Sequence, residues 1–151
     1  MRRSADFYRS APSQPPLKVE EGERATESQT FQTNALALSA INEVHFFDAA
    51  NRIRRIDANG HVITVAGNGE RGETVVLGPA RDHALPTVGQ IVFSADNLLY
   101  FTALGRVYRI VNGQIEAVAG SGLPGLNGEE MPALELNLGT TVKAAFMRLD
   151  G

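Results

Sequence analysis

The chain has 151 residues, 43% of them hydrophobic and 21% charged, which is the balance of one ordinary globular domain. Its formal net charge of −3, with no long run of Lys and Arg, argues against nucleic acid or an anionic membrane as a partner, and the absence of cysteine excludes disulfides and cysteine-based zinc sites. We find neither a secretory signal nor a stretch apolar enough to span a membrane, so we expect a soluble chain, secreted only if an upstream signal was lost.

Residues 1–31 predict a disordered leader. They are rich in Ser, Pro, Glu and Arg and contain few apolar side chains. Such a segment buries too little apolar surface to offset the entropy lost on ordering. An amphipathic helix over residues 17–28 is the alternative. The folded part is therefore expected at 32–151.

From Ala35 onward, short apolar or β-branched runs alternate with Gly, Asn, Asp and Pro, which predicts strands and turns. The expected strands are at about 35–39, 44–48, 52–57, 62–66, 90–94, 98–102, 106–111, 115–119 and 141–147. Asn-Gly pairs at 59–60 and 112–113 predict hairpin turns.

The two halves of this region are copies of one another, 54 residues apart and then 53 apart after a one-residue deletion. The positions that agree are Phe47 with Phe101, and Arg52, Arg55, Gly67, Gly69 and Gly72 with Arg106, Arg109, Gly120, Gly122 and Gly125. Repeat 1 covers about 35–86, repeat 2 about 87–139, and a third repeat begins at 140.

The stretch from Arg52 to Gly72 reads RIRRIDANGHVITVAGNGERG. It resembles the signature of the NHL-repeat β-propellers, in particular the bacterial and teneurin-like type, and the resemblance covers about 35–147. Where the family has G-D-G-G, the two copies read VVLG at 75–78 and GEEM at 128–131, so both lack the family's Asp.

The resemblance implies an all-β fold with four-stranded antiparallel blades. The sequence contains two such blades and the first strand of a third, whereas closed propellers have about 4–8 blades. We therefore expect a partial propeller: a fragment of a longer protein, the product of a degraded gene, or a piece that self-associates through its open blades.

The glycines at 67, 69 and 72 also match the spacing of a dinucleotide-binding fingerprint. That fingerprint requires a helix directly behind the glycines, whereas here the sequence continues into Gly78 and Pro79. The glycines therefore predict tight loops rather than a phosphate site, and we expect no cofactor.

Among the repeated arginines Arg52, Arg55, Arg106 and Arg109, we expect one of each pair to bind a carboxylate or a loop carbonyl and the other to be solvated. Asp48 is expected to be a turn residue or an arginine partner. His45 and His61 have no duplicated counterpart and are expected at the surface. A metal site needs at least three converging ligands, and no histidine pair has metal-binding spacing, so we expect no metal.

The long loops after the fourth strands, 67–89 and 120–141, are expected to form one rim that binds a protein or a glycan. We call residues 67–89 the rim loop, and Arg71, Asp82 and His83 are its candidate binding residues. The predicted function is thus a non-enzymatic binding or scaffold module.

The resemblance also implies an alternative, a fragment of a metal-dependent lyase or a lactonase-like propeller enzyme. That function requires inward-facing Glu, Asp, Asn or His side chains near the first strands, and these strands have almost none. No Ser-His-Asp arrangement or other catalytic constellation occurs. A third possibility is a piece without independent function because it cannot close.

Overall fold

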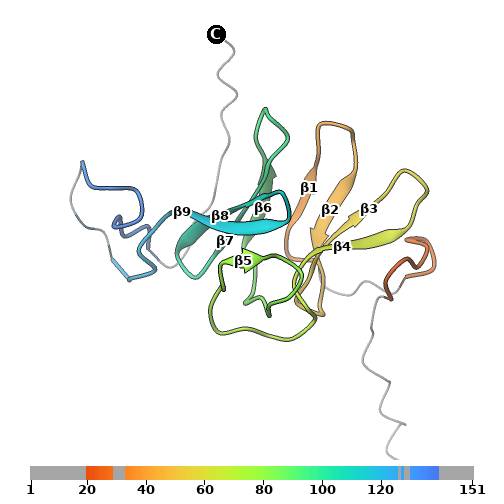
Figure 1. The fold of residues 1–151 in the computed structure, drawn as a ribbon, viewed down its shortest axis with the longest axis horizontal. Coiled ribbons are helices and arrows are strands. Elements are labelled where there is room, and N and C mark those ends of the chain that lie inside the picture. Colours follow the sequence, from red (N-terminus) through yellow and green to blue (C-terminus); the bar gives the residue numbers. More distant parts are fainter. Residues whose placement is uncertain (1–19, 29–32, 126, 128–129, 140–151) are drawn as a thin grey trace, which may run out of the picture.

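The computed structural model describes residues 20–28, 33–125, 127 and 130–139, which form two antiparallel sheets side by side (Figure 1). No helix occurs among these residues, so the predicted all-β fold class is confirmed. The described ranges accordingly contain no helix of the length and apolar character needed to cross a membrane.

Sheet 1 has the strand order β1-β2-β3-β4, and sheet 2 has the order β5-β9-β8-β7-β6. The strands of sheet 1 are β1 (Leu36–Leu38), β2 (Val44–Phe47), β3 (Ile53–Ile56) and β4 (Val62–Ala66). Those of sheet 2 are β5 (Gly78–Pro79), β6 (Gln90–Phe93), β7 (Leu99–Ala103), β8 (Arg106–Val111) and β9 (Gln114–Ala119). All of these except β5 match predicted strands; the strand predicted at 141–147 lies outside the described residues.

The turns explain why these strands pair as hairpins. Asn112 and Gly113 have φ values of 50° and 74° and form the predicted two-residue turn, of the type whose twist suits antiparallel strands. Asn59 and Gly60 instead lie in a longer turn, in which the Gly60 N–H donates to the Asp57 carbonyl oxygen at 2.9 Å.

The two-residue strand β5 was not predicted. It precedes β6 in the chain but pairs with β9, with Gly78 opposite Ile115 and Pro79 opposite Gln114. A proline is tolerated there because β5 is an edge strand. The pairing partner lies more than 30 residues away, so local sequence contains no signal for it.

Residues 20–28, which we call the strap, belong to the predicted leader but pack on β4. The Ala25 N–H donates to the Gly60 carbonyl oxygen at 2.8 Å, as the Ala80 N–H behind β5 donates to the Gly113 carbonyl oxygen at 2.8 Å. The strap therefore takes at sheet 1 the position that β5 takes at sheet 2. The rest of the leader, 1–19 and 29–31, lies outside the described residues.

The strand register corrects the sequence alignment of β2 with β7. Phe46 lies opposite Leu36, and Phe101 lies opposite Ile91, so Phe46 rather than Phe47 corresponds to Phe101. The second repeat is one residue shorter in the β7–β8 turn than the first repeat is in the β2–β3 turn. It is also one residue shorter in the β8–β9 turn than in the β3–β4 turn, so the two deletions lie in different places. A shift of one residue matters because it moves every side chain of a strand to the other face.

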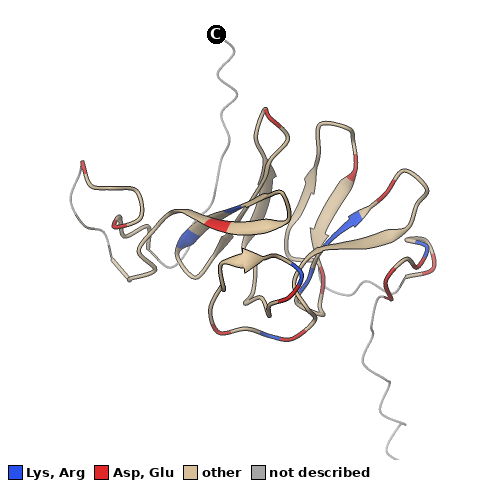
Figure 2. Cartoon of the chain, in the orientation of Figure 1, with Lys and Arg blue, Asp and Glu red and all other residues tan. Residues whose placement is uncertain are grey.

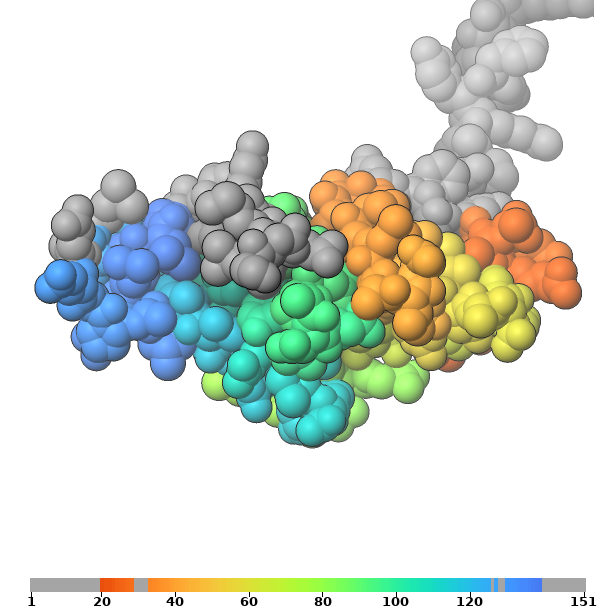
Figure 3. Space-filling view, turned by 90° about the horizontal axis from the view of Figure 1, so that it is seen from above, coloured from red at the N-terminus to blue at the C-terminus, as the bar shows by residue number. Residues whose placement is uncertain are grey.

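The main core lies between the two sheets, where β1 contacts β6. Figure 3 shows the two halves packed against each other, with the orange part of sheet 1 beside the green part of sheet 2. Sheet 1 contributes Ala35, Phe47, Ile53 and Ala66, and sheet 2 contributes Ile91, Leu99, Phe101, Ala103, Tyr108 and Ile115. Ala80, Leu85 and Val88 of the rim loop are buried in the same core. The rim loop is thus anchored by its own apolar side chains.

Candidate functional site

The rim loop begins at a glycine turn that contacts an arginine. The Arg52 guanidinium donates to the carbonyl oxygen of Asn68 at 3.1 Å. A Cβ on Gly69 would lie 2.6 Å from that guanidinium, and a Cβ on Gly67 would lie 2.5 Å from the carbonyl oxygen of Asn51. Both glycines also have positive φ values, which L-residues rarely adopt. Only glycine fits at these two positions.

The second repeat builds the same arrangement. Arg106 donates to the carbonyl oxygen of Ser121 at 2.5 Å. A Cβ on Gly122 would lie 2.8 Å from the Arg106 Nε, and a Cβ on Gly120 would collide with the carbonyl oxygen of Gly105. The repeated arginine and Gly-x-Gly therefore start both loops in the same way.

The second arginine of each repeat also has a partner. Arg55 Nη1 lies 2.7 Å from Glu43 Oε1, and Arg109 Nε lies 2.8 Å from Glu116 Oε2. The second arginine of each pair is partly exposed, at 33% for Arg55 and 41% for Arg109, as expected for a solvated side chain, and it also binds a carboxylate. Arg109 can bond because Glu116 stands directly opposite on β9, in the register that the two-residue turn at Asn112-Gly113 sets.

The third glycines of the two repeats differ. A Cβ on Gly72 would lie 2.9 Å from the carbonyl oxygen of Ala84, whereas a Cβ on Gly125 would meet no atom within 4 Å. Gly125 has a φ of 90° and Gly72 does not have a positive φ. The two loops thus diverge after their first glycine pair.

A hollow of about 450 Å³ opens between the rim loop and the β7–β8 turn. Its lining residues are Arg71, Gly72, Glu73, Pro86, Thr87 and Leu104. Asp82 and His83 do not line it, and the His83 carbonyl oxygen instead accepts the N–H of Asn68 at 3.1 Å. Of the three candidate binding residues, only Arg71 lies at this hollow.

Leu104 stands out among the lining residues because of its backbone. Leu104 and Gly105 form the two-residue turn between β7 and β8, with φ values of 51° and 71°. Such turns favour Asn, Asp or Gly at the first central position, since a Cβ is disfavoured in the left-handed region. The leucine side chain is nevertheless 50% exposed, so packing does not compensate for the strain.

A buried ionic cluster lies under the strap. The Arg54 side chain is 0% exposed; its Nη1 lies 3.6 Å from Asp48 Oδ2 and its Nη2 lies 3.7 Å from Glu21 Oε2. Burial raises the pKa of the Asp48 carboxyl, although the Arg52 amide, the Arg54 guanidinium and the Ala50 amide act against it. The expected role of Asp48 as a turn residue and arginine partner is confirmed.

Glu21 ties the strap to this cluster. Its carboxylate accepts hydrogen bonds from the Thr64 amide at 3.0 Å and from the Thr64 hydroxyl at 2.5 Å. Burial raises the pKa of Glu21, but the Thr64 hydrogen bonds and the Arg54 and Arg81 charges together hold it below its ordinary value. Sequence reasoning missed the cluster because the strap had been assigned to the leader.

His45 was expected at the surface, yet it is buried between the sheets. Its ring meets the Phe93 ring edge to face with centroids 4.7 Å apart, and its Nδ1 lies 3.2 Å from the Glu43 carbonyl oxygen. Burial lowers the pKa of His45, with Arg55 acting in the same direction and Glu43 opposing. The expectation failed because β1 and β6 meet on this face of β2.

We expect the free energy of unfolding to decrease as the pH falls from about 7.5 to 5, because the neutral form of His45 is the one that fits the fold. The folded pKa of His45 lies below its ordinary 6.5, so the unfolded chain takes up a proton more readily than the folded chain. The folded state therefore becomes less stable as the pH falls through this window. Urea unfolding at several pH values measures the slope. His45→Phe should flatten it, and an unchanged slope in the variant would contradict the assignment.

Charged residues of both signs are interspersed along the described strands and loops (Figure 2). Arginines lie on β3 and β8, and Glu116 lies on β9. Within the described ranges, no three His, Asp or Glu side chains gather as a metal-binding group. The geometry at the rim is therefore that of a surface hollow with one cation, one carboxylate and an exposed leucine.

Comparisons with known proteins assign no family. No protein-family model matches the chain, and no curated protein matches it. Among solved structures, it is similar to a structural genomics protein of unknown function from Bacteroides thetaiotaomicron, with 20% identity and a TM-score of 0.44. The match covers 62% of this chain and 23% of that protein, so this chain spans less than a quarter of its length.

Proposed function

We propose that the chain is a partial β-propeller of the NHL-repeat type and serves as a non-enzymatic binding module, which captures a protein at the hollow beside Arg71 and Leu104. Two features support the architecture. The chain repeats one antiparallel hairpin order in both sheets, and an arginine and Gly-x-Gly arrangement starts the loop after each fourth strand.

The conformation of Leu104 is the observation that carries the binding site. A leucine with a φ of 51° costs about 1–2 kcal/mol relative to an unstrained backbone. Residues held in such conformations cluster at functional sites, where the strain serves something other than stability. Leu104 is half exposed and lines the hollow that also contains Arg71, so its side chain is held where a partner can contact it.

The chemistry of the rim favours a protein over a glycan. The rim loop contains no Phe, Tyr or Trp on which a sugar ring could stack. It does have an exposed aliphatic side chain, Leu77, at 54% exposure, and the hollow itself combines Leu104 with a guanidinium and a carboxylate. Exposed apolar groups with an arginine nearby are typical of protein interaction surfaces.

A reciprocal pair of variants tests this site. Leu104→Asn should raise the free energy of unfolding by about 1 kcal/mol, because asparagine tolerates the left-handed region, and should weaken binding about tenfold. Asn112→Leu places a leucine with the same strained backbone in the two-residue β8–β9 turn, which does not line the hollow. This variant should have a lower free energy of unfolding and unchanged binding. The measurements are urea unfolding and the affinity for a peptide selected on the wild-type chain from a phage-displayed random library.

Arg71→Ala completes the design. It should also weaken peptide binding about tenfold, since arginines at the centre of interfaces often dominate affinity. Asp82→Asn and His83→Asn, which lie on the same loop but do not line the hollow, should bind like the wild type. Peptides that bind the Leu104→Asn and Arg71→Ala variants at wild-type strength would refute the site, and capture on an oligosaccharide array alone would refute the partner class.

A further inference from the structure

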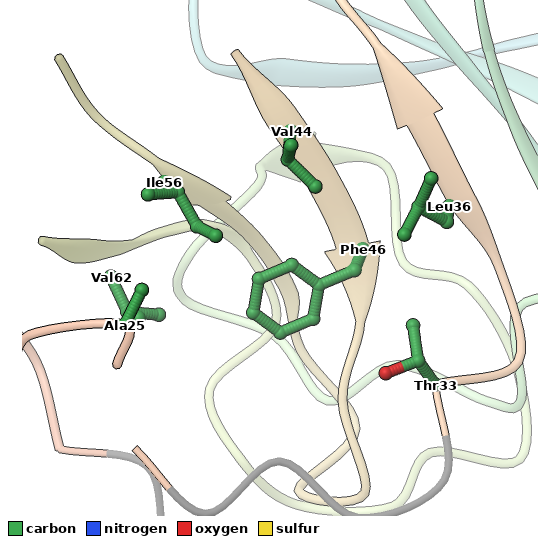
Figure 4. A pocket seen from close by; sticks show the side chains of 7 residues that line it. All are labelled: Ala25, Thr33, Leu36, Val44, Phe46, Ile56 and Val62. Atoms are coloured by element: carbon green, nitrogen blue, oxygen red, sulfur yellow. The ribbon is translucent and has the colours of Figure 1, made fainter. Parts of the chain in front are cut away.

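The face of sheet 1 that is directed away from sheet 2 carries a row of apolar side chains, and we call it the open face. Its residues are Leu36, Leu38, Val44, Phe46, Ile56 and Val62. Leu36 and Leu38 are 64% and 57% exposed. A hollow of about 170 Å³ lies among these residues, bordered by Ala25 and Thr33 (Figure 4). Exposed apolar surface of this kind marks an interaction site.

The same face of sheet 2 is buried. The cross-strand pairs Leu36–Phe46, Leu38–Val44 and Ile56–Val62 correspond to Ile91–Phe101, Phe93–Leu99 and Ile110–Ile115. Four of these sheet 2 residues, Ile91, Leu99, Phe101 and Ile115, are at most 5% exposed. The sheet 1 face differs in two ways: Arg54 stands where sheet 2 has Tyr108, and only Leu36 and Leu38 are strongly exposed. Phe46 and Val62 are buried beside Ala25 of the strap.

Sheet 2 is covered by the opposite face of sheet 1. Phe47 and Ile53, with Ala37 at their border, pack in the core between the sheets, and His45 meets Phe93. By the same register, the residues of sheet 2 that correspond to Ala37, His45, Phe47 and Ile53 are Val92, Tyr100, Thr102 and Val107. We call these four residues the covering face of sheet 2. Val92, Tyr100 and Val107 are partly exposed and Thr102 is buried, so the first three are the part of this face that a partner can contact. Each chain therefore has one open face and one covering face, on different sheets.

We propose that a second copy of this chain covers the open face with the covering face of its sheet 2, and so repeats between copies the packing that joins the two sheets within one copy. Tyr100 of the second copy then lies against Leu38, as His45 lies against Phe93. Because the two faces differ, the association is head to tail, and it closes into a ring when the rotation per copy allows it.

This proposal rests on the propeller-type packing of the proposed function but not on its rim site. A ring of 4–8 sheets would contain roughly two to four copies of a two-sheet chain.

The outer edge of β4 is not available for an edge-to-edge contact. The strap closes the outer edge of β4 through hydrogen bonds between Gly22 and Val62 and between Ala25 and Gly60. A closed edge offers no unpaired ladder for another strand. The exposed leucines of β1 are therefore the accessible part of the open face.

The experiment measures the mass of the full chain in solution by sedimentation over a concentration series. Wild type should show masses that are multiples of 16.2 kDa. Leu38→Lys on the open face and Val92→Lys on the covering face should each sediment as a monomer, because a charge would be buried in the contact. Leu77→Lys, an equally exposed leucine on the rim loop, is the matched control and should associate like wild type.

Mixing the two monomeric variants gives the sharpest result. Each retains the face that the other has lost, so a head-to-tail contact predicts a one-to-one dimer of twice the chain mass. A monomeric wild type at every concentration, a wild-type mass for Leu38→Lys, or no dimer in the mixture would each overturn the proposal. Thermal unfolding shows that the variants fold, and unchanged peptide binding by the Leu38→Lys monomer separates this result from a failure of the rim site.

Discussion

Replacing Gly67 by alanine is expected to lower the free energy of unfolding by about 3 kcal/mol or more. Two causes add. Gly67 has a φ of 91°, which alanine adopts only at a cost, and the new Cβ would lie 2.5 Å from the Asn51 carbonyl oxygen and 3.2 Å from Leu85 Cδ1. Neither neighbour is free to yield, because one is backbone and the other is fully buried in the core. Urea unfolding monitored by circular dichroism measures the loss.

Gly60→Ala separates the two causes. Gly60 has a similar φ of 80°, but a Cβ there would meet nothing within 4 Å. Its replacement should cost only the backbone term, about 1–2 kcal/mol. Equal losses for Gly67→Ala and Gly60→Ala would show that the close approach of the rim loop to the β2–β3 turn does not contribute to stability.

Replacing Arg54 by methionine is expected to lower the free energy of unfolding by about 3–5 kcal/mol at neutral pH. The variant keeps most of the side-chain volume but removes the charge and the hydrogen bond that Arg54 donates to the Glu20 carbonyl oxygen. It leaves the Asp48 carboxylate, 2% exposed, without the guanidinium that lies 3.6 Å away. A buried carboxylate without its cation is costly because the protein interior solvates charge poorly.

The loss of unfolding free energy in Arg54→Met should become smaller as the pH is lowered from about 7 to 4. Burial already raises the pKa of Asp48 above its ordinary 3.8, and removal of Arg54 raises it further. A carboxyl with a raised folded pKa favours the fold when protonated, and this contribution is lost as the pH rises through that pKa. Arg109→Met is the control: its Glu116 partner is 45% exposed, so the loss should stay below about 1 kcal/mol at every pH. Losses of equal size in the two variants would contradict the account.

The strands were predictable because their signals are local. Alternation in β4, where Val62 and Thr64 are buried between more exposed neighbours, and the Asn112-Gly113 turn can both be read within a few residues. The register of β2 was not predictable from identities alone. The alignment matched Phe47 with Phe101 because both are phenylalanine, whereas the lengths of the turns decide which phenylalanine faces which side.

The candidate site was predictable only in its framework. The duplicated arginines and glycines indicated where the loops begin, and the structure shows how those residues contact one another. The hollow itself depends on Leu104, which comes from a turn of the other sheet, and on a backbone angle that residue types do not reveal. His45 was misjudged for a related reason, since its burial results from contact between two sheets and not from its own strand.

The pairing of β5 with β9 has a consequence for where this chain can be cut. The sequence repeat changes at about residue 87, but sheet 2 begins earlier, at Gly78. The segment between β5 and β6 contributes Leu85 and Val88 to the core. A truncated chain starting at residue 87 would keep β6 to β9 and still expose the edge of β9. An exchangeable module therefore starts inside the rim loop, ahead of Gly78, and includes part of the preceding repeat, so that neighbouring units overlap along the chain.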